Sequence, residues 1–528
     1  MEQTKPHLKQ DSRRHQLLEY LLPALFFAGL LLVGFYVYKD YGLTWDDLAQ
    51  IEIGRVNFDY IFNNDPTLLQ LKNRYYGPLF EVILYNLTHA LPDPQLFQMR
   101  HLYTFLIFYF GMFFFYLLAK RITKSWFFAL LGCLILAATP RIFAHSFYNS
   151  KDIPFMAMFI IAIYSLIVFL DKPSLPGAIL HGIISAILIS LRAPGILIVA
   201  LTVGGLLLDG IFKPDKTELV QKVTSGIAYI LVATGFMVLF WPILWHAPFE
   251  EFLNAILQMG KFPWLGGTVF YRAKFVEADQ LPWHYIPLWV LITTPLSYLV
   301  LFGTGVIKVG LSFIHIKNQL WTPAKRNYLL VSAWGLVPVL TVILLKSVLY
   351  DGWRQMFFIY PAIVLFATLG LQSVCTLNFW GRHKRLTTIL GITVIALIFI
   401  EPVNFMIRYH PHQNVYFNHL AGRDMQRVKR HYELDYWGLS YKQGLEFILE
   451  NDPSGLIKIN TYNAPGRINA RILPQPEAKR IKFVETPEEA DYFITNYRWH
   501  PEFYDYPNEI FQIRIGNASI LSVFKMKP

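Results

Sequence analysis

The chain has 528 residues, of which 54% are hydrophobic and 16% are charged. A soluble protein carries about 25% charged residues, so this composition excludes an ordinary soluble globular protein. The formal net charge of +11 does not point to a nucleic-acid-binding protein, because many of the Lys and Arg residues stand between long apolar runs. Basic residues in such positions set the orientation of membrane helices.

Apolar runs of about the length that crosses a bilayer follow one another along the first three quarters of the chain. The first run follows a basic tail, but it has about 20 apolar residues and no small-residue cleavage site, which favours an uncleaved helix over a signal peptide. The sequence therefore predicts an α-helical polytopic membrane protein with about eleven transmembrane helices. The runs are 17–38, 101–119, 125–140, 154–170, 176–191, 195–211, 224–244, 285–306, 327–345, 355–376 and 387–406.

The basic residues of the connecting segments predict the orientation of these spans. With the N-terminus in the cytoplasm, the cytoplasmic connections hold many more Lys and Arg residues than the short outer ones. Eleven spans then place the C-terminus outside the cytoplasm. The cytoplasmic set is Lys120, Arg121, Lys124, Lys172, Lys213, Lys216, Lys222, Lys308, Lys317, Lys325, Arg326, Arg382, Lys384 and Arg385, and the outer set is Arg141, Lys151, Arg192, Lys346 and Arg354.

The character of the chain changes after residue 406, which divides it into two predicted domains. Residues 1–406 form the transmembrane domain, with long outer loops at 39–100 and 245–284. Residues 407–528 are polar and predict a soluble extracytoplasmic α/β domain. We expect a helix at 441–450 and strands at 457–462, 481–485, 492–497 and 511–524, the last being a hairpin that turns at Gly516-Asn517.

Two adjacent carboxylates, Asp46 and Asp47, follow the first span on the predicted outer side. Neighbouring side chains on a helix diverge by about 100°, so one carboxylate can face a reaction centre while the other caps the helix. A carboxylate at this place can act as a general base on an acceptor hydroxyl or bind a divalent cation. The alternative is that the pair only caps the helix, where acidic residues are favoured.

A second polar cluster lies in the predicted outer turn between the third and fourth spans. It contains Asn149, Lys151 and Asp152 and is more polar than a minimal turn needs. A polar turn in which Pro154 starts the next helix is the simpler interpretation. Since two acidic clusters face the same side, however, the sequence favours a shared site.

Basic residues on the same side suit an anionic ligand. Arg354 opens the tenth span, where an arginine can make bidentate contact with a phosphate or simply reach the membrane interface. Lys72, Arg74 and Tyr76 precede an interfacial helix and suit an anionic headgroup or ordinary anchoring.

The segment that follows the last span contains three histidines, His410, His412 and His419, which do not have the spacing of a zinc motif. We therefore predict no metal site there. Together with residues 435–438, this segment is placed to cover a cavity at the outer end of the spans.

The acidic stretch 46–55 resembles the first-loop helix of the C-type (GT-C) membrane glycosyltransferases, and most of all the group of protein O-mannosyltransferases and lipid A aminoarabinose transferases. That group has an Asp-Glu pair followed at similar spacing by Glu and Arg, as Glu52 and Arg55 follow here. Two departures stand out: Asp47 replaces the usual Glu, and Gly77 replaces a lysine that contacts the donor phosphate. Further matching positions are Tyr76-Gly-Pro-Leu, Asp152, Arg354 with Pro361, and the ending 490–497.

This resemblance implies a glycosyltransferase that moves a sugar from a polyprenyl-phosphate donor to an extracytoplasmic lipid, glycan or protein. It implies one inverting displacement in which Asp46 is the general base and Asp152 orients the acceptor or the base. Arg354, with Arg74 or Arg272, would neutralise the leaving phosphate. The expected catalytic residues are Asp46, Asp47 and Asp152, and the expected substrate-binding residues are Lys72, Arg74, Tyr76, Asn149, Lys151, Arg272 and Arg354.

The remaining expectations concern partners and place. No cofactor is required, a divalent cation is optional, and the partners are the lipid-linked donor, membrane lipids and the acceptor, with no nucleic acid. The location is a bacterial inner membrane, or the endoplasmic reticulum membrane in a eukaryote. A flippase or transporter of lipid-linked sugars is the alternative, but such proteins place ionisable residues near the bilayer midplane and often carry repeats, whereas these charges cluster at one surface.

Overall fold

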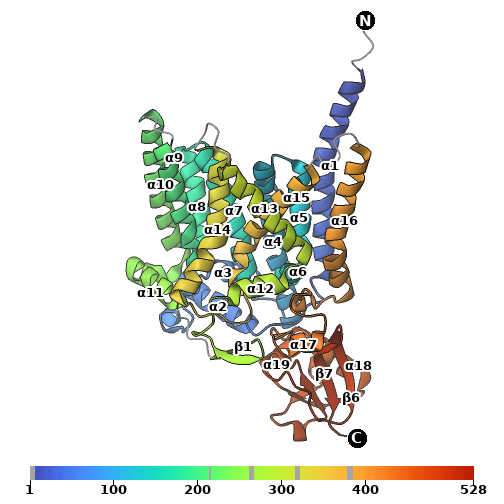
Figure 1. Cartoon of the computed structure of the whole chain (residues 1–528). Helices are drawn as coiled ribbons and strands as arrows, with labels where there is room; N and C mark the ends of the chain where they lie inside the picture. The colour runs from blue at the N-terminus through green and yellow to red at the C-terminus, as the bar shows by residue number, and fades with distance from the viewer. Residues whose placement is uncertain (1–5, 213–215, 261–266, 315–320, 377–383, 528) are drawn as a thin grey trace.

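A computed structural model of the chain describes residues 6–212, 216–260, 267–314, 321–376 and 384–527. Long helices form a bundle, and the two termini lie at opposite ends of it (Figure 1). The sheet of the C-terminal domain, residues 407–528, lies beyond the end of the bundle that is remote from the N-terminus. An odd number of spans requires this placement of the termini. Three of the basic residues used to predict the orientation, Lys213, Lys317 and Arg382, lie outside the described residues.

Within the described residues, nine helices are long and apolar enough to cross a membrane. A tenth is present if the broken pair α5 (Trp126–Ala137) and α6 (Pro140–Tyr148) counts as one span, and α8 (Leu175–Leu191) is a shorter apolar helix. Each of the eleven predicted runs thus overlaps helical structure, although two of them are divided between α-helices. The nine are α1 (Pro6–Val37), α4 (Asp93–Thr123), α7 (Asp152–Asp171), α9 (Leu197–Phe212), α10 (Lys216–Phe240), α13 (Leu296–Ile314), α14 (Pro323–Leu345), α15 (Tyr360–Thr376) and α16 (Lys384–Arg408).

Two of the predicted spans are wrong as continuous helices. The run 125–140 ends at Ala137, and the chain bends by 69° into α6, whose first residue is Pro140. The run 285–306 is divided between α12 (Tyr285–Thr293) and α13 by Thr294 and Pro295. Pro140 is the first residue of α6, and Pro295 directly precedes α13. A proline has no N–H to donate, so in both places it ends the old helix and lies at the start of a new one.

Short elements gather at the end of the bundle that carries the C-terminal domain (Figure 1). All of them belong to the two long loops. Helices α2 (Asp47–Asn63) and α3 (Leu79–Thr88) lie in the first loop, and α11 (Pro248–Gly260) and the hairpin of β1 (Thr268–Tyr271) and β2 (Lys274–Glu277) lie in the second. The 3-10 turns of the chain are Pro66–Gln70, Ala193–Ile196, Pro242–Trp245, Arg354–Ile359, Gln413–Val415, Asn469–Ile472 and Pro487–Glu489.

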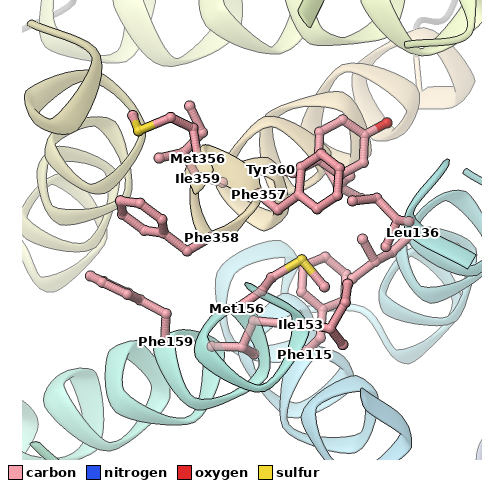
Figure 2. Packing of buried hydrophobic residues seen from close by; sticks show 14 of the residues in the cluster. Phe115, Leu136, Ile153, Met156, Phe159, Met356, Phe357, Phe358, Ile359 and Tyr360 are labelled. Carbon is pink, nitrogen blue, oxygen red and sulfur yellow. The ribbon is translucent and has the colours of Figure 1, made fainter. Parts of the chain in front are cut away.

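Helix α7 runs through the core of the bundle. It is hydrophobic on all sides, as expected of a helix that is surrounded by protein. Of the residues in its apolar 18-residue stretch, 89% are buried. Its Phe159 stacks on Trp334 of α14 at 5.7 Å and on Phe358 at 5.0 Å, and Figure 2 shows the side chains of α4, α5 and 356–360 that surround it. This packing fixes Arg354, the first residue of the 354–359 turn, close to the N-terminus of α7.

The C-terminal domain contains a five-stranded sheet with the order β4-β3-β5-β7-β6. Strand β3 is parallel to both of its neighbours, and β7 is antiparallel to β5 and β6. The predicted strands and the predicted hairpin are confirmed, and Gly516 takes the positive φ of 60° that the tight turn needs. The elements are α17 (Met425–Lys429), α18 (Tyr441–Asn451), β3 (Ile457–Thr461), α19 (Ala464–Ile468), α20 (Gln475–Ala478), β4 (Ile481–Phe483), β5 (Tyr492–Thr495), β6 (Glu509–Ile515) and β7 (Ala518–Lys525).

Candidate active site

The two adjacent carboxylates at the start of α2 point to different partners. Asp47 Oδ2 accepts hydrogen bonds from the Thr44 N–H at 2.6 Å and from the Thr44 hydroxyl at 2.7 Å, and burial raises the pKa of Asp47 to about 6. Asp46 makes no capping bond, and its Oδ2 lies 3.3 Å from Nη1 of Arg354. The divergence predicted for the pair is therefore present, but Asp47 holds the first turn of α2 and its predicted catalytic role has no support in the geometry.

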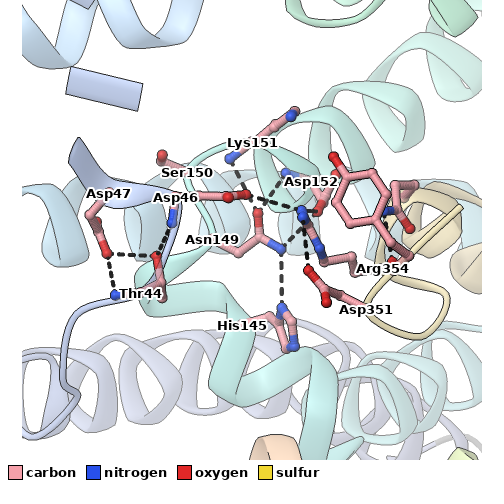
Figure 3. Close-up of polar contacts among 12 residues, drawn as sticks. Thr44, Asp46, Asp47, His145, Asn149, Ser150, Lys151, Asp152, Asp351 and Arg354 are labelled. Atoms are coloured by element: carbon pink, nitrogen blue, oxygen red, sulfur yellow. Dashed lines mark hydrogen bonds and ion pairs between the residues drawn. The ribbon is translucent and has the colours of Figure 1, made fainter. Parts of the chain in front are cut away.

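Arg354 joins Asp46 to the second acidic residue that the sequence singled out. Its Nη1 also lies 3.1 Å from Oδ2 of Asp152, the first residue of α7, and Figure 3 shows both carboxylates turned toward the guanidinium. The side chains of Asp152 and Arg354 are 2% and 1% exposed, whereas that of Asp46 is 32% exposed. Asp46 is thus the carboxylate of this group that a substrate can reach.

Asn149 fixes the position of Asp152 at the start of α7. Its Oδ1 accepts from the Asp152 backbone N–H at 2.9 Å, and its Nδ2 donates to Asp152 Oδ2 at 3.0 Å. The same Nδ2 lies 3.0 Å from Nδ1 of His145 on α6 (Figure 3). Asn149 was predicted to bind substrate, but its contacts make it a residue that orients the carboxylate.

Two partners of the cluster were missed as site residues. Arg192, which follows α8, forms an ion pair with Oδ1 of Asp152. Asp351 places its Oδ2 at 3.5 Å from Nη2 of Arg354. Arg192 had been counted only as an outer charge, and the signal that marks it is a lone arginine at the end of an otherwise apolar helix, where an unpaired charge is costly.

Lys151 lies beside the cluster on the ring of Tyr76, with Nζ 3.6 Å from the ring centroid. Burial lowers the pKa of Lys151 to about 7, while the charge of Asp46 opposes that shift. The structure therefore brings these two predicted substrate-binding residues next to Asp46. A lysine with this pKa is partly charged at neutral pH.

The other three predicted substrate-binding residues lie elsewhere. Lys72 is exposed, and Arg74 packs on the ring of Tyr75 at 4.8 Å. Arg272 is exposed at the turn between β1 and β2, with φ of 53°. Among the contacts of the described residues, none joins these three side chains to Asp46, Asp152 or Arg354, so their predicted role as phosphate partners has no support in the geometry.

A buried ion pair supports the cluster from behind. Glu81 of α3 accepts from Arg100 of α4 at 2.5 Å and from the Ser150 hydroxyl at 2.5 Å. Glu81 and Arg100 are both almost fully buried, so the pair ties α3 and α4 to the turn that carries Lys151.

Several hydrogen-bond donors in the cluster have no acceptor in the part of the chain that the structure describes. Among the described residues, Nε and Nη2 of Arg354 and Nε of Arg192 are buried without a hydrogen-bond partner, and so is Nε1 of Trp437. The ring of Trp437 covers the Arg354 guanidinium at 4.6 Å, as expected if residues 435–438 cover the site. Buried donors are rarely left unpaired in proteins, and unpaired donors on neighbouring side chains suit the oxygens of an anion. The described residues contain no group of three His, Cys, Asp or Glu side chains that could hold a metal ion.

Comparison with known protein families bears directly on this cluster. Residues 78–246 match the family described as dolichyl-phosphate-mannose-protein mannosyltransferase. The match confirms the resemblance to the C-type membrane glycosyltransferases. It includes Asn149, Lys151, Asp152 and Arg192 of the cluster and excludes Asp46 and Arg354. No curated protein sequence matches the chain.

Solved structures similar to this chain include membrane glycosyltransferases from a bacterium and an archaeon. ArnT from Cupriavidus metallidurans, bound to undecaprenyl phosphate, is 11% identical over 95% of this chain and 97% of that protein, with a TM-score of 0.47. The apo oligosaccharyltransferase of Archaeoglobus fulgidus is 11% identical over 88% of this chain, with a TM-score of 0.43. This chain spans 65% of the length of that oligosaccharyltransferase. The A. fulgidus AglB complex with an inhibitory peptide and a dolichol-phosphate is 10% identical over 91% of this chain and 70% of that protein, with a TM-score of 0.44.

Proposed function

We propose that this protein transfers a sugar from a polyprenyl-phosphate donor to an acceptor outside the cytoplasm, with Asp46 as the general base. The observation that carries the proposal is the arrangement at Arg354. A carboxylate that substrate can reach lies 3.3 Å from a buried guanidinium that still has donors without partners. A base and an anion-binding group in contact are what a displacement with a phosphate leaving group needs.

The proposed reaction is a single displacement at the anomeric carbon. The acceptor oxygen forms a bond to that carbon while Asp46 takes the acceptor's proton. The bond from the anomeric carbon to the phosphate oxygen breaks on the opposite face, and its electron pair leaves with the polyprenyl phosphate, so the configuration inverts. Arg354, helped by Lys151, stabilises the charge that develops on the leaving phosphate. Asp152 and Arg192 hold Arg354 in place without touching the reacting atoms.

The donor class is supported by the family that matches residues 78–246, whose description names a lipid-phosphate mannose. The proposed orientation is supported by the charges of the connecting segments, and the termini at opposite ends of the bundle are consistent with it (Figure 1). With the N-terminus in the cytoplasm, the cluster and the C-terminal domain lie outside it. We propose a bacterial inner membrane, or the endoplasmic reticulum membrane if the source is a eukaryote.

The test uses the full chain in lipid nanodiscs with undecaprenyl-phosphate mannose, or its glucose or arabinose counterpart, and a membrane extract of the source cells as acceptor. Mass spectrometry measures the undecaprenyl phosphate released and the sugar transferred. We expect Asp46→Asn to lower the rate by about 100-fold or more, the usual contribution of a general base. Asp47→Asn is the matched control, because an Asn side chain can still accept from Thr44, and we expect it to stay within about threefold of the wild-type rate.

Three results would contradict the proposal. One is a folded Asp46→Asn variant that transfers sugar at the wild-type rate. Another is a loss of rate in Asp47→Asn that equals the loss in Asp46→Asn. The last is a wild-type protein that moves a lipid-linked sugar across the membrane without consuming it, which is the behaviour of a flippase.

A further inference from the structure

The C-terminal domain reaches the candidate active site through Trp437, which covers the Arg354 guanidinium, and through the buried side chain of Arg498. Its Nη2 donates to Oδ1 of Asp351 at 2.7 Å, and its Nη1 donates to the Tyr436 carbonyl at 2.5 Å. The other oxygen of Asp351 lies 3.5 Å from Nη2 of Arg354. Asp351 is therefore held between two arginines, one from the transmembrane domain and one from the C-terminal domain.

Arg498 also contacts the segment that carries Asp46. Its guanidinium lies 5.0 Å from the ring of Trp45 and 4.5 Å from the ring of Trp499, within the range of a cation–π interaction. The two indole rings are themselves 5.7 Å apart. Because Trp45 directly precedes Asp46, a single side chain of the C-terminal domain contacts the neighbours of both the proposed base and the proposed phosphate-binding arginine.

The backbone around this contact is strained. Tyr497 and Trp499, on either side of Arg498, have φ of 60° and 61°, and Asp351 has φ of 56°. Residues other than glycine seldom adopt these angles, and bulky aromatic residues least of all. Such conformations persist where the surroundings hold them in place, and they cluster at functional sites. In the Arg498–Asp351 ion pair, Asp351 itself and both neighbours of Arg498 have this backbone conformation.

A second ion pair between the two domains provides a contrast. Arg471 donates to Asp93, the first residue of α4, at 2.7 Å and 3.1 Å. Both side chains are well exposed, and the described contacts include none from either of them to Asp46, Asp152, Asp351 or Arg354. This pair helps the domains to dock without reaching the cluster.

We propose that Arg498 is a positioning residue, which holds Asp351 and through it Arg354, and holds the start of α2 through Trp45. The C-terminal domain is then a part of the active site that sets its geometry. This inference rests on the proposed function for its kinetic test. It also predicts that Arg498 keeps two segments, 44–50 and 350–354, in a fixed conformation, and this can be measured without any substrate.

The kinetic test compares Arg498→Gln with Arg471→Gln in the full chain, with undecaprenyl-phosphate mannose as donor. We expect Arg498→Gln to lower kcat by about tenfold to 100-fold, because misplacing a charged group by about 1 Å has effects of that size. The KM for the donor should change much less than kcat, because Arg354 acts mainly on the charge that develops on the leaving phosphate in the transition state. Arg471→Gln should leave both constants within about twofold, as expected for an exposed ion pair.

Two further variants separate positioning from general damage to the fold. Arg498→Lys keeps the charge and should recover part of kcat. Asp351→Asn should lower kcat as Arg498→Gln does, and the double variant should be no slower than the slower single variant, because both act through Arg354. If Arg498→Gln does not fold, Arg498→Lys and Asp351→Asn carry the test.

Hydrogen–deuterium exchange gives a readout that needs no activity. Arg498→Gln should raise exchange in peptides covering 44–50 and 350–354, whereas Arg471→Gln should not. A wild-type protein inactive with every donor contradicts the proposed function alone, and the exchange result still decides this inference. The inference is overturned if Arg498→Gln keeps the wild-type kcat, if its effect multiplies with that of Asp351→Asn, or if exchange in those two segments is unchanged.

Discussion

Helix α7 begins and ends with an aspartate, and each aspartate is held by two arginines. Asp152 at one end pairs with Arg192 and Arg354. Asp171 at the other end pairs with Arg121 and Arg326. The two clusters lie on the same helix, and each joins one aspartate to two arginines, although the side chains of Asp171 and Arg121 are more exposed, at 26% and 33%, than those of Asp152 and Arg354. Each cluster contains one almost fully buried arginine, Arg354 or Arg326, and the informative difference is how that arginine uses its hydrogen-bond donors.

The cluster at Asp171 satisfies its own donors. Arg326 donates to Asp171 and to Asp209, the latter at 2.6 Å, and its remaining bonds go to Asn327 and to the Leu170 carbonyl. Trp321 also donates to Asp209, at 2.7 Å. All three nitrogens of Arg326 are therefore used, which is the pattern of a cluster whose task is to hold helices together.

The cluster at Asp152 does not satisfy its donors. Within the described part of the chain, two nitrogens of Arg354 and one of Arg192 are buried without a hydrogen-bond partner, Asp46 stays within reach of a substrate, and the neighbouring Asp351 has a positive φ. Buried polar groups that lack partners are costly, and proteins keep such features at functional sites. Unused hydrogen-bond donors, and not buried charge as such, therefore separate the cluster at Asp152 from the cluster at Asp171.

The largest effect that tests this comparison is expected on stability. Arg326→Gln leaves Asp171 and Asp209 without their shared cation, and removing one partner of a buried ion pair costs about 3–5 kcal/mol. We expect the free energy of unfolding to fall by about that amount, measured by denaturant or thermal unfolding in detergent. The transfer rate per folded molecule should remain unchanged, because the cluster lies at the other end of α7.

This prediction would be wrong if Arg326→Gln unfolded at the wild-type midpoint. It would also be wrong if the folded variant lost transfer activity to the same extent as Asp46→Asn. Either result would remove the distinction between a cluster that holds helices and one that acts on a ligand.

Much of the architecture was predictable from the sequence because its signals are local. A helix buried in a membrane needs a long apolar run, and nine of the eleven predicted runs are not broken into separate α-helices, the exceptions being 125–140 and 285–306. The C-terminal strands follow from short β-rich runs between turn residues. The shared site of Asp46 and Asp152 was predictable because charged residues are costly inside the apolar spans, so those on the same side of the membrane tend to gather at its surface.

The parts that could not be predicted depend on contacts between distant residues. Arg498 and Asp351 are 147 positions apart, and no local pattern connects them. The sequence predicted that Asp46 and Asp47 diverge but not which of them faces Arg354, since that depends on where α7 and the 354–359 turn pack. Arg74 and Arg272 were chosen as phosphate partners for their charge alone, and the fold places both away from the cluster.

A smaller effect is expected from pH, through Lys151. Burial lowers the pKa of Lys151 to about 7 from an unfolded value of 10.5. Between those values the unfolded chain binds more protons, so the contribution of this group to stability rises as pH increases through that range. Anion binding should change in the opposite direction, because the folded lysine loses its charge as pH rises through about 7.

We therefore expect the KM for undecaprenyl-phosphate mannose to rise by up to about tenfold between pH 6 and pH 8.5, which corresponds to the loss of one charge-assisted contact of roughly 1.4 kcal/mol. The donor is a phosphate diester and keeps its single charge throughout. Lys151→Met should show the higher KM at every pH. A pH dependence that persists unchanged in Lys151→Met would contradict this role.

The central claim is that the unpaired donors of Arg354 and Arg192, beside Asp152, bind the phosphate of a polyprenyl lipid. Its most direct test is the affinity of the full chain for undecaprenyl phosphate in nanodiscs, with Arg354→Lys compared with Arg326→Lys at a temperature where both are folded. Lysine keeps the charge in both variants and removes the planar fork of donors. We predict that Arg354→Lys binds about tenfold or more weakly, as expected for a lost bidentate contact, while Arg326→Lys binds like the wild type. Equal affinity in both variants would contradict the account.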